Sequence, residues 1–248
     1  MSAVTVAATK LETNAEAVGE RPAVDVAADG SALALWSQGT SLLASRFSGS
    51  SWASPLTVAT VGAGGARPSV RFAADGTAIA AWTDGRVRAS TFAGTWAAPD
   101  TLDASAAGLV ISGLSLALAP DGKALVVWHQ GSSGSQHAWQ ALLEPAGWGT
   151  SFRIDSTAAA TNGGRVAFDA SGAAVAVWSE ADSPSNVRAG QFRPLVGWSA
   201  PQLVETDDSL NAGAREPTVG YDAGANKFVA VWLQGGIGFT SVYSSRFE

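Results

Sequence analysis

Five polar residues stand at one fixed spacing from a tryptophan and could bind a ligand. The tryptophans are Trp36, Trp82, Trp128, Trp178 and Trp232, and the residues two positions after them are Gln38, Asp84, Gln130, Glu180 and Gln234. Each of the five side chains carries a carbonyl-type oxygen. Amide and carboxylate groups beside aromatic walls offer the paired donors and acceptors that sugar hydroxyls need. The spacing therefore makes the five residues candidate ligand contacts.

Three arginines and one further tryptophan extend this candidate set. Arg21, Arg67 and Arg215 precede segments that we expect to be strands, on the same face as the five polar residues. Trp139 occurs in one repeat only, so it is the leading candidate for an exposed aromatic ligand contact. A structural role competes with binding. The polar residues would then cap backbone groups at hairpins, and the arginines would bridge neighbouring repeats.

The elements that must position these residues form a tandem repeat. Arg21-Pro-Ala-Val, Asp29-Gly and Ala32-Leu-Ala-Leu-Trp36 recur as Arg67-Pro-Ser-Val, Asp75-Gly and Ala78-Ile-Ala-Ala-Trp82. Three more copies carry Trp128, Trp178 and Trp232, so the five tryptophans are 46, 46, 50 and 54 residues apart. A period in the forties with several short strands per copy is typical of a β-propeller blade.

Each repeat predicts four antiparallel strands and no helix, because short apolar runs alternate with Asp-Gly, Ser-Gly or Gly-Ser turns. The run that ends in tryptophan is apolar on both faces, as expected for a strand between two neighbouring sheets. A buried indole removes on the order of 200 Å² from water, which at ~25 cal/mol/Å² stabilises the fold by several kcal/mol. We therefore predict an all-β, five-bladed β-propeller of four-stranded antiparallel blades. It would form a single domain over residues 1–248, with units at approximately 21–66, 67–111, 112–162, 163–213 and 214–248.

The last unit ends before its fourth strand, and the N-terminus resembles the missing piece. Val6-Ala-Ala-Thr-Lys-Leu11-Glu precedes Arg21 at about the distance at which Gln202-Leu-Val-Glu precedes Arg215. We expect residues 4–12 to complete the fifth blade as its outer strand. Such a velcro closure would leave no exposed sheet edge.

Loop lengths indicate which face of the propeller is functional. The turns between the first and second strands are short and uniform, whereas the connections after the five tryptophans range from Thr83-Asp-Gly to a nine-residue segment from His129 to His137. Function tends to lie on connections that vary. The face that carries the connections after the tryptophans is therefore the expected binding face.

The sequence supports no catalytic or metal site. Inner-strand carboxylates Asp25, Asp169 and Asp222 are not expected to converge as the acid and base of a glycosidase must. Glu180 and Glu216 lie nearer the variable face, without a clear partner. His129 and His137 lack a third ligand for a metal. We predict no catalytic residue, no metal ligand and no cofactor.

Composition narrows the class of partner. The 248 residues carry a net charge of −6 and the pI is about 4.9, which argues against binding to a nucleic acid backbone. Cysteine is absent, so disulfides and thiolate sites are excluded. The first residues lack a signal peptide pattern, and no apolar stretch is long enough to insert into a membrane. The compartment and the oligomeric state stay open, and a secreted or extracellular location is compatible with glycan binding.

The repeat number and period resemble those of the five-bladed propeller lectins of the tachylectin-2 type, and the Ala- and Gly-rich units resemble bacterial propeller repeats. Lectins of that type bind N-acetylated sugars between blades, but their motifs do not match these units, so no lectin residue is transferred. The resemblance implies a non-catalytic, lectin-like protein that binds glycans or cell-surface carbohydrate at several repeated sites. A five-bladed glycoside hydrolase and a protein-interaction scaffold without a small ligand are the alternatives.

Overall fold

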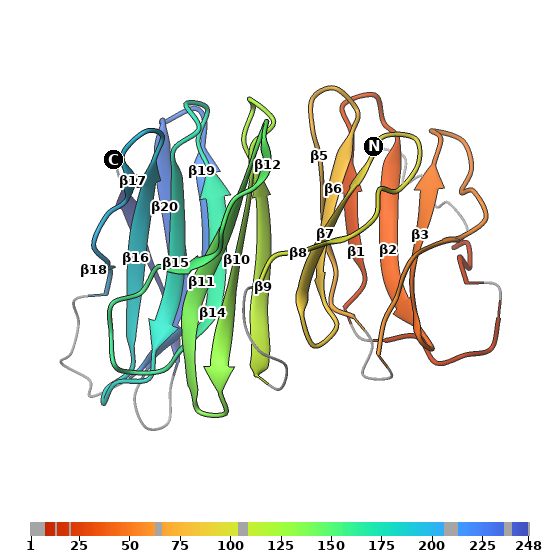
Figure 1. Cartoon of the computed structure of the whole chain (residues 1–248). Coiled ribbons are helices and arrows are strands. Elements are labelled where there is room, and N and C mark those ends of the chain that lie inside the picture. The colour runs from red at the N-terminus through yellow and green to blue at the C-terminus, as the bar shows by residue number, and fades with distance from the viewer. Residues whose placement is uncertain are drawn as a thin grey trace.

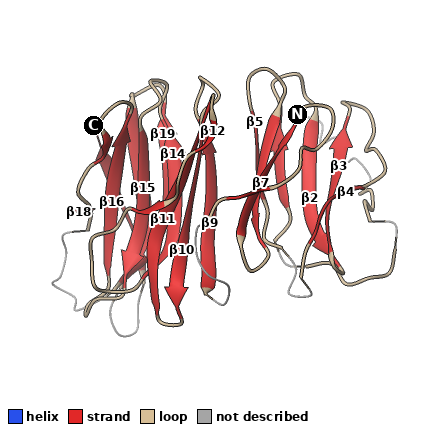
Figure 2. Cartoon of the chain, in the orientation of Figure 1, coloured by secondary structure: helices blue, strands red, loops and turns tan. Residues whose placement is uncertain are grey.

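The computed structural model describes residues 8–12, 14–19, 21–62, 66–103, 109–205, 213–235 and 240–247. Within these ranges the chain forms five antiparallel sheets and no helix (Figure 1, Figure 2). The prediction of an all-β, five-bladed propeller is confirmed. The described part of the chain contains no helix long and apolar enough to cross a membrane.

The five sheets follow one another along the chain, and we number them as blades 1 to 5. Blade 1 consists of β1 (Ala23–Val26), β2 (Ala32–Gln38), β3 (Ser41–Phe47) and β4 (Leu56–Thr60). Blade 2 consists of β5 (Ser69–Phe72), β6 (Ala78–Thr83), β7 (Val87–Phe92) and β8 (Asp100–Thr101). In both blades the strands pair in chain order.

The fourth strand is divided in the next two blades. Blade 3 consists of β9 (Val110–Leu118), β10 (Ala124–Ser132), β11 (Ser135–Glu144), β12 (Gly147–Trp148) and β13 (Phe152–Arg153). Blade 4 consists of β14 (Thr161–Phe168), β15 (Ala174–Glu180), β16 (Asn186–Arg193), β17 (Gly197–Trp198) and β18 (Gln202–Leu203). In each blade both short outer segments pair with the third strand. Blade 5 has three strands among the described residues, β19 (Ala214–Asp222), β20 (Lys227–Gln234) and β21 (Ser241–Phe247).

The strand-end tryptophans pack between blades, as predicted. Trp82, Trp128 and Trp178 are fully buried, and Trp36 and Trp232 are nearly so. Trp82 lies in a core cluster with Leu33 and Leu35 of blade 1, and the tryptophans of blades 3, 4 and 5 likewise lie in clusters shared with the preceding blade. Since each sheet is apolar on both faces, neighbouring blades supply each other's core.

The tryptophans near the rim also have packing roles. Trp52, Trp96 and Trp198 contact phenylalanines of the third strand, with ring centroids 5.2 to 5.8 Å apart. Trp148 pairs with Leu143 and packs on the core between blades 2 and 3. These four tryptophans therefore have packing partners within or beside their own blade.

Four core clusters join consecutive blades, and among the described residues none joins blade 5 to blade 1. Val24 and Val26 of β1 are 59% and 61% exposed, whereas the residue equivalent to Val24 in blade 2, Val70, is buried. Val242 of β21 is 73% exposed, whereas its equivalent in blade 1, Leu42, is buried. Blade 1 and blade 5 therefore each present one open apolar flank.

The predicted closing strand lies partly outside the described residues. Residues 4–7 are not described, and residues 8–12 form no strand. Residues 14–19 instead lie against the end of β2, where Gly19 donates its backbone N–H to Ser37 and Gly39 donates to Ala17. Closure by the N-terminus stays a prediction, as do the single domain and the unit boundaries.

Candidate functional site

Three of the five polar candidates bind the tryptophan that precedes them. The indole Nε1–H of Trp128 donates to Gln130 Oε1 at 2.8 Å, and Trp36 and Trp232 make the same bond to Gln38 and Gln234 at 3.3 and 3.0 Å. All three glutamines are at most 2% exposed. Their amides therefore satisfy buried indole donors where the second strand ends.

Asp84 and Glu180, the two acidic candidates, pair with arginines instead. Arg88 Nε lies 3.1 Å from Asp84 Oδ2, and Arg188 Nε lies 2.5 Å from Glu180 Oε2. Both arginines occupy the third-strand position opposite the tryptophan, which in the glutamine blades holds Leu43, Trp139 and Tyr243. A buried carboxylate needs a counter-charge and a buried amide does not, which explains why the two positions change together.

This register also places Trp139. The residue occupies the same position as Leu43 and Tyr243, is half-buried and packs on the core between blades 2 and 3. Its role in ligand contact stays a prediction.

Three buried carboxylates were missed by sequence reasoning. Asp103, Asp155 and Glu205 each lie two residues after the end of an outer strand and are at most 6% exposed. Asp103 accepts the backbone N–H of Val87 at 2.8 Å, and Asp155 accepts that of Ala138 at 2.6 Å. Glu205 accepts the amide of Gln234 at 2.9 Å and so ties blade 4 to blade 5. An acidic residue after an apolar one at the end of three repeats was the available signal.

The two histidines do not meet. His129 is fully buried, its Nδ1 lies 2.8 Å from Thr161 Oγ1, and its Nε2 accepts the backbone N–H of Gly164 at 2.8 Å. Burial, followed by the nearby charges of Arg165 and His137, lowers the pKa of His129 to about 3. The neutral ring therefore links blade 3 to blade 4. His137 Nδ1 lies 3.2 Å from Asp155. The described residues contain no group of three or more side chains that could hold a metal.

The inner-strand carboxylates hold backbone groups. Asp25 accepts the N–H of Phe72 at 2.8 Å and links blades 1 and 2. Asp169 and Asp222 accept N–H groups within their own turns, from Ser171 at 2.8 Å and from Gly224 at 3.0 Å. These three carboxylates therefore have structural partners.

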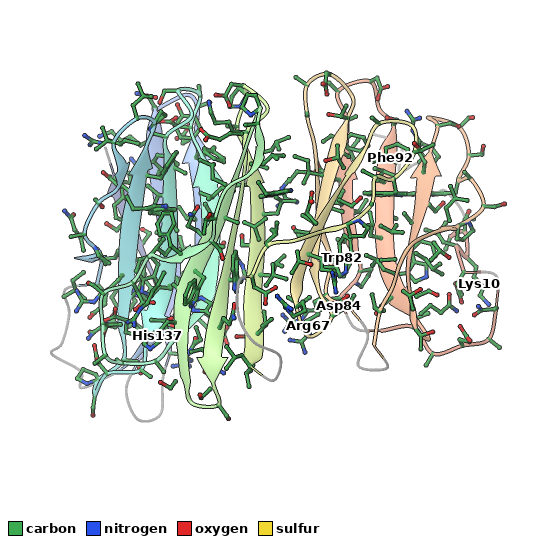
Figure 3. The ribbon with its side chains drawn as sticks, in the orientation of Figure 1. Lys10, Arg67, Trp82, Asp84, Phe92 and His137 are labelled. Atoms are coloured by element: carbon green, nitrogen blue, oxygen red, sulfur yellow. The ribbon has the colours of Figure 1, made fainter. Side chains whose placement is uncertain are left out.

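Arg21 and Arg67 come together with two arginines that the sequence did not single out. A cavity of about 480 Å³ lies among the first strands of blades 1 to 4 and is lined by Arg21, Arg67, Arg71 and Arg165. Its wall also carries neutral polar side chains, namely Thr83, Ser69, Ser112, Ser115 and Asn162, beside Pro68, Leu114 and two glycines. We call this space the central cavity. Figure 3 shows Arg67 toward the same end of the blades as Asp84 and His137, and Phe92 toward the other end.

Bulges in the first strand shape the wall of the central cavity. Gly113 and Gly163 line it with φ of 64° and 69°, and Arg21 has a φ of 62°. A Cβ on Gly113 would lie 2.7 Å from the ring of His129, so glycine is required there for both backbone and space.

Arg215 lies elsewhere. In blade 5 the position equivalent to Arg21 is held by Glu216, with a φ of 53°, so Arg215 is one residue out of register with Arg21 and Arg67. Arg215 is exposed and donates to Thr240 Oγ1 at 3.2 Å. Blade 5 contributes no residue to the lining of the central cavity.

Two smaller cavities occupy equivalent places near the first turns of blades 4 and 1. The first, of about 320 Å³, is lined by residues that include Asp169, Gln191 and Phe228, and the second, of about 280 Å³, by residues that include Asp29 and Arg46. Gln191 and Arg46 hold the same register position in their blades. We call these two cavities the turn cavities. The repeat thus forms a similar hollow twice, on the face opposite the central arginines.

Comparison with known proteins shows the fold alone. Neither a scan against protein-family models nor a search of curated proteins gave a match. Among solved structures, a protein of unknown function from Dyadobacter fermentans is similar at 14% identity, covering 91% of this chain and 75% of that chain with a TM-score of 0.59. An α-L-arabinanase from Penicillium chrysogenum, solved with arabinobiose, is similar at 12% identity, 90% and 80% coverage and a TM-score of 0.54. An ulvan lyase of polysaccharide lyase family PL25 is similar at 9% identity, with a TM-score of 0.61, where this chain covers 63% of the lyase and the match spans 90% of this chain.

Proposed function

We propose that this protein is a non-catalytic carbohydrate-binding propeller and that the central cavity is its principal binding site. The observation that carries the proposal is the lining of that cavity, in which guanidinium, hydroxyl and amide groups from four blades face one space of about 480 Å³. Cavities that bind small ligands commonly measure about 300–1,000 Å³. Arg21 and Arg67, two of the candidates from the sequence, would contact the ligand directly.

The fold supports a carbohydrate ligand by analogy. Two of the similar structures are an arabinanase and a polysaccharide lyase. The number and period of the repeats also resemble those of tachylectin-2-type lectins. Fold analogy is a weak argument for activity, because one fold carries many functions. The chemistry of the cavity wall is therefore the main support.

The positions of the carboxylates favour binding over hydrolysis. Most glycosidases use two carboxylates that flank the scissile bond, and the described residues that line the central cavity include no carboxylate. The inner-strand carboxylates are engaged with backbone N–H groups.

The turn cavities of blades 4 and 1 favour weaker, repeated sites in addition. Their equivalent positions match the expectation of several repeated sites, and simultaneous occupation would raise the affinity for a long glycan. The buried candidates Gln38, Asp84, Gln130, Glu180 and Gln234 would contribute indirectly, by fixing the ends of the second strands.

A glycan array followed by titration calorimetry tests the proposal. We expect saccharide binding that Arg67→Gln weakens and that Asp25→Asn leaves within about twofold, provided that both variants melt within a few degrees of the parent protein. Release of reducing ends that is abolished in Asp25→Asn would instead support a glycoside hydrolase. Absence of both binding and turnover would refute the proposal and favour a protein-interaction scaffold.

A further inference from the structure

Four arginines share the central cavity without a counter-charge. Arg21, Arg67, Arg71 and Arg165 form no ion pair with any described residue, and none of the described residues that line the cavity is a carboxylate. Four arginines outside the cavity behave differently. Each of Arg86, Arg88, Arg153 and Arg188 lies against a carboxylate. The protein as a whole is acidic, with a net charge of −6, so the charge gathered in the cavity is opposite in sign to the charge of the whole protein.

Two of the four guanidinium groups are held by the backbone. Arg71 Nη1 donates to the carbonyl of Val70 at 2.7 Å, and Arg165 Nη1 donates to the carbonyl of Gly164 at 2.8 Å. A guanidinium has five N–H donors, so each group keeps most of them for a ligand. The planar fork matches the oxygens of a carboxylate or sulfate, and a group that is already held loses less entropy on binding.

His129 lies behind the cavity wall, and burial, followed by the charge of Arg165, lowers the pKa of its ring. Like charges in one cavity repel one another, and an anion relieves that repulsion whereas an uncharged sugar does not.

Hydroxyl and amide groups lie in the same wall. Thr83, Ser112 and Asn162 can bond the hydroxyls of a saccharide beside the charged groups. We infer that the ligand of the central cavity is an acidic saccharide that carries carboxylate or sulfate groups, bound through Arg67, Arg71 and Arg165. This inference rests on the proposed function.

Titration calorimetry with matched oligosaccharides tests it. The acidic probes are a hyaluronan tetrasaccharide and a chondroitin sulfate tetrasaccharide, the neutral probes are chitotetraose and cellotetraose, and sodium sulfate is the simple anion. We expect the acidic probes to bind at least tenfold more tightly than the neutral ones at 50 mM salt, and to weaken at 300 mM salt.

Single charge removals locate the site. Arg71→Gln, Arg165→Gln and Arg67→Gln should each weaken the acidic probes about 10- to 100-fold, as expected for loss of a charged hydrogen bond. Glutamine retains a donor for the backbone carbonyls, and the Arg67 side chain forms no hydrogen bond or ion pair with another described residue, so the folds should survive. Arg246→Gln removes an exposed charge from β21, outside the cavity, and should change affinity less than twofold.

Each other outcome overturns part of the reasoning. Equal affinity for neutral and acidic probes would refute the acidic ligand and leave the proposed function intact. Tight sulfate binding without saccharide binding would refute both, as would no binding at all. Acidic binding that resists all three cavity variants would refute the location.

Discussion

The neutral state of His129 makes a definite prediction about stability and pH. Its pKa is about 6.5 in an unfolded chain and about 3 in the folded protein, because burial disfavours the charged ring. Between these values the unfolded state binds the proton and the folded state does not, so lowering the pH favours unfolding. The linkage is at most about 1.4 kcal/mol per pH unit, which amounts to a loss of roughly 2 to 3 kcal/mol between pH 7.5 and pH 4.5.

Replacement of the ring isolates this contribution. His129→Gln keeps an amide near Thr161 and Gly164 but removes the titration, so we expect it to destabilise the protein by about 1–3 kcal/mol at pH 7.5. The gap between parent and variant should then shrink by roughly 2 to 3 kcal/mol at pH 4.5, since only the parent loses stability through this group. Urea unfolding followed by tryptophan fluorescence at four pH values measures the gap. Contributions from carboxylates common to both proteins cancel in the difference.

Ser115→Ala provides the matched control. Ser115 accepts the N–H of Val166 at 3.3 Å across the same junction between blades 3 and 4 but does not titrate. The loss of stability caused by Ser115→Ala should not depend on pH. A gap between parent and His129→Gln that stays constant from pH 7.5 to pH 4.5 would refute the argument that His129 is neutral because it is buried.

Three further predictions test the packing between strands and blades. Gly164→Ala should destabilise the protein by about 1–3 kcal/mol, because the new Cβ would lie 2.6 Å from His129 Nε2. The control is Gly220→Ala, whose Cβ would have no atom within 4 Å. It should change the free energy of unfolding by less than about 0.5 kcal/mol in the same urea assay. Arg188→Leu should cost about 3–5 kcal/mol by leaving Glu180 buried without its partner, and the double variant with Glu180→Gln, which copies Gln38 and Leu43 of blade 1, should recover most of that loss. Recovery of less than half would contradict the paired exchange. Trp178→Ala should cost about 3–5 kcal/mol and the half-buried rim variant Trp52→Ala clearly less, and equal costs would argue against the interblade core.

The architecture was predictable because the residues that form the core recur at the same places in each repeat. The spacing of Trp36, Trp82 and the three later strand-end tryptophans gives the length of one blade. Strands that are apolar on both faces indicate sheets that pack against a neighbour on each side. The Asp-Gly turns were equally local, since Asp75 bonds Thr77 two residues away.

The central cavity could not be predicted in the same way, because it depends on contacts between repeats. Arg71 and Arg165 lie 94 positions apart in the sequence, and nothing in either local pattern indicates that their strands face one space. His129 binds Gly164, 35 residues away, for the same reason. Arg215 was expected to be equivalent to Arg21, but the bulge at Glu216 adds one residue and shifts Arg215 out of that position.

The open flanks at Val24 and Val242 indicate where unfolding should begin. Blades 2, 3 and 4 are sandwiched between two partners, but blades 1 and 5 each lean on a single neighbour among the described residues. In a row of modules whose stability is the sum of nearest-neighbour terms, the outermost members open at the lowest energy. Amide protons of β2 and β20 should therefore exchange with deuterium sooner than those of β10, and loss of structure should spread inward from both extremities.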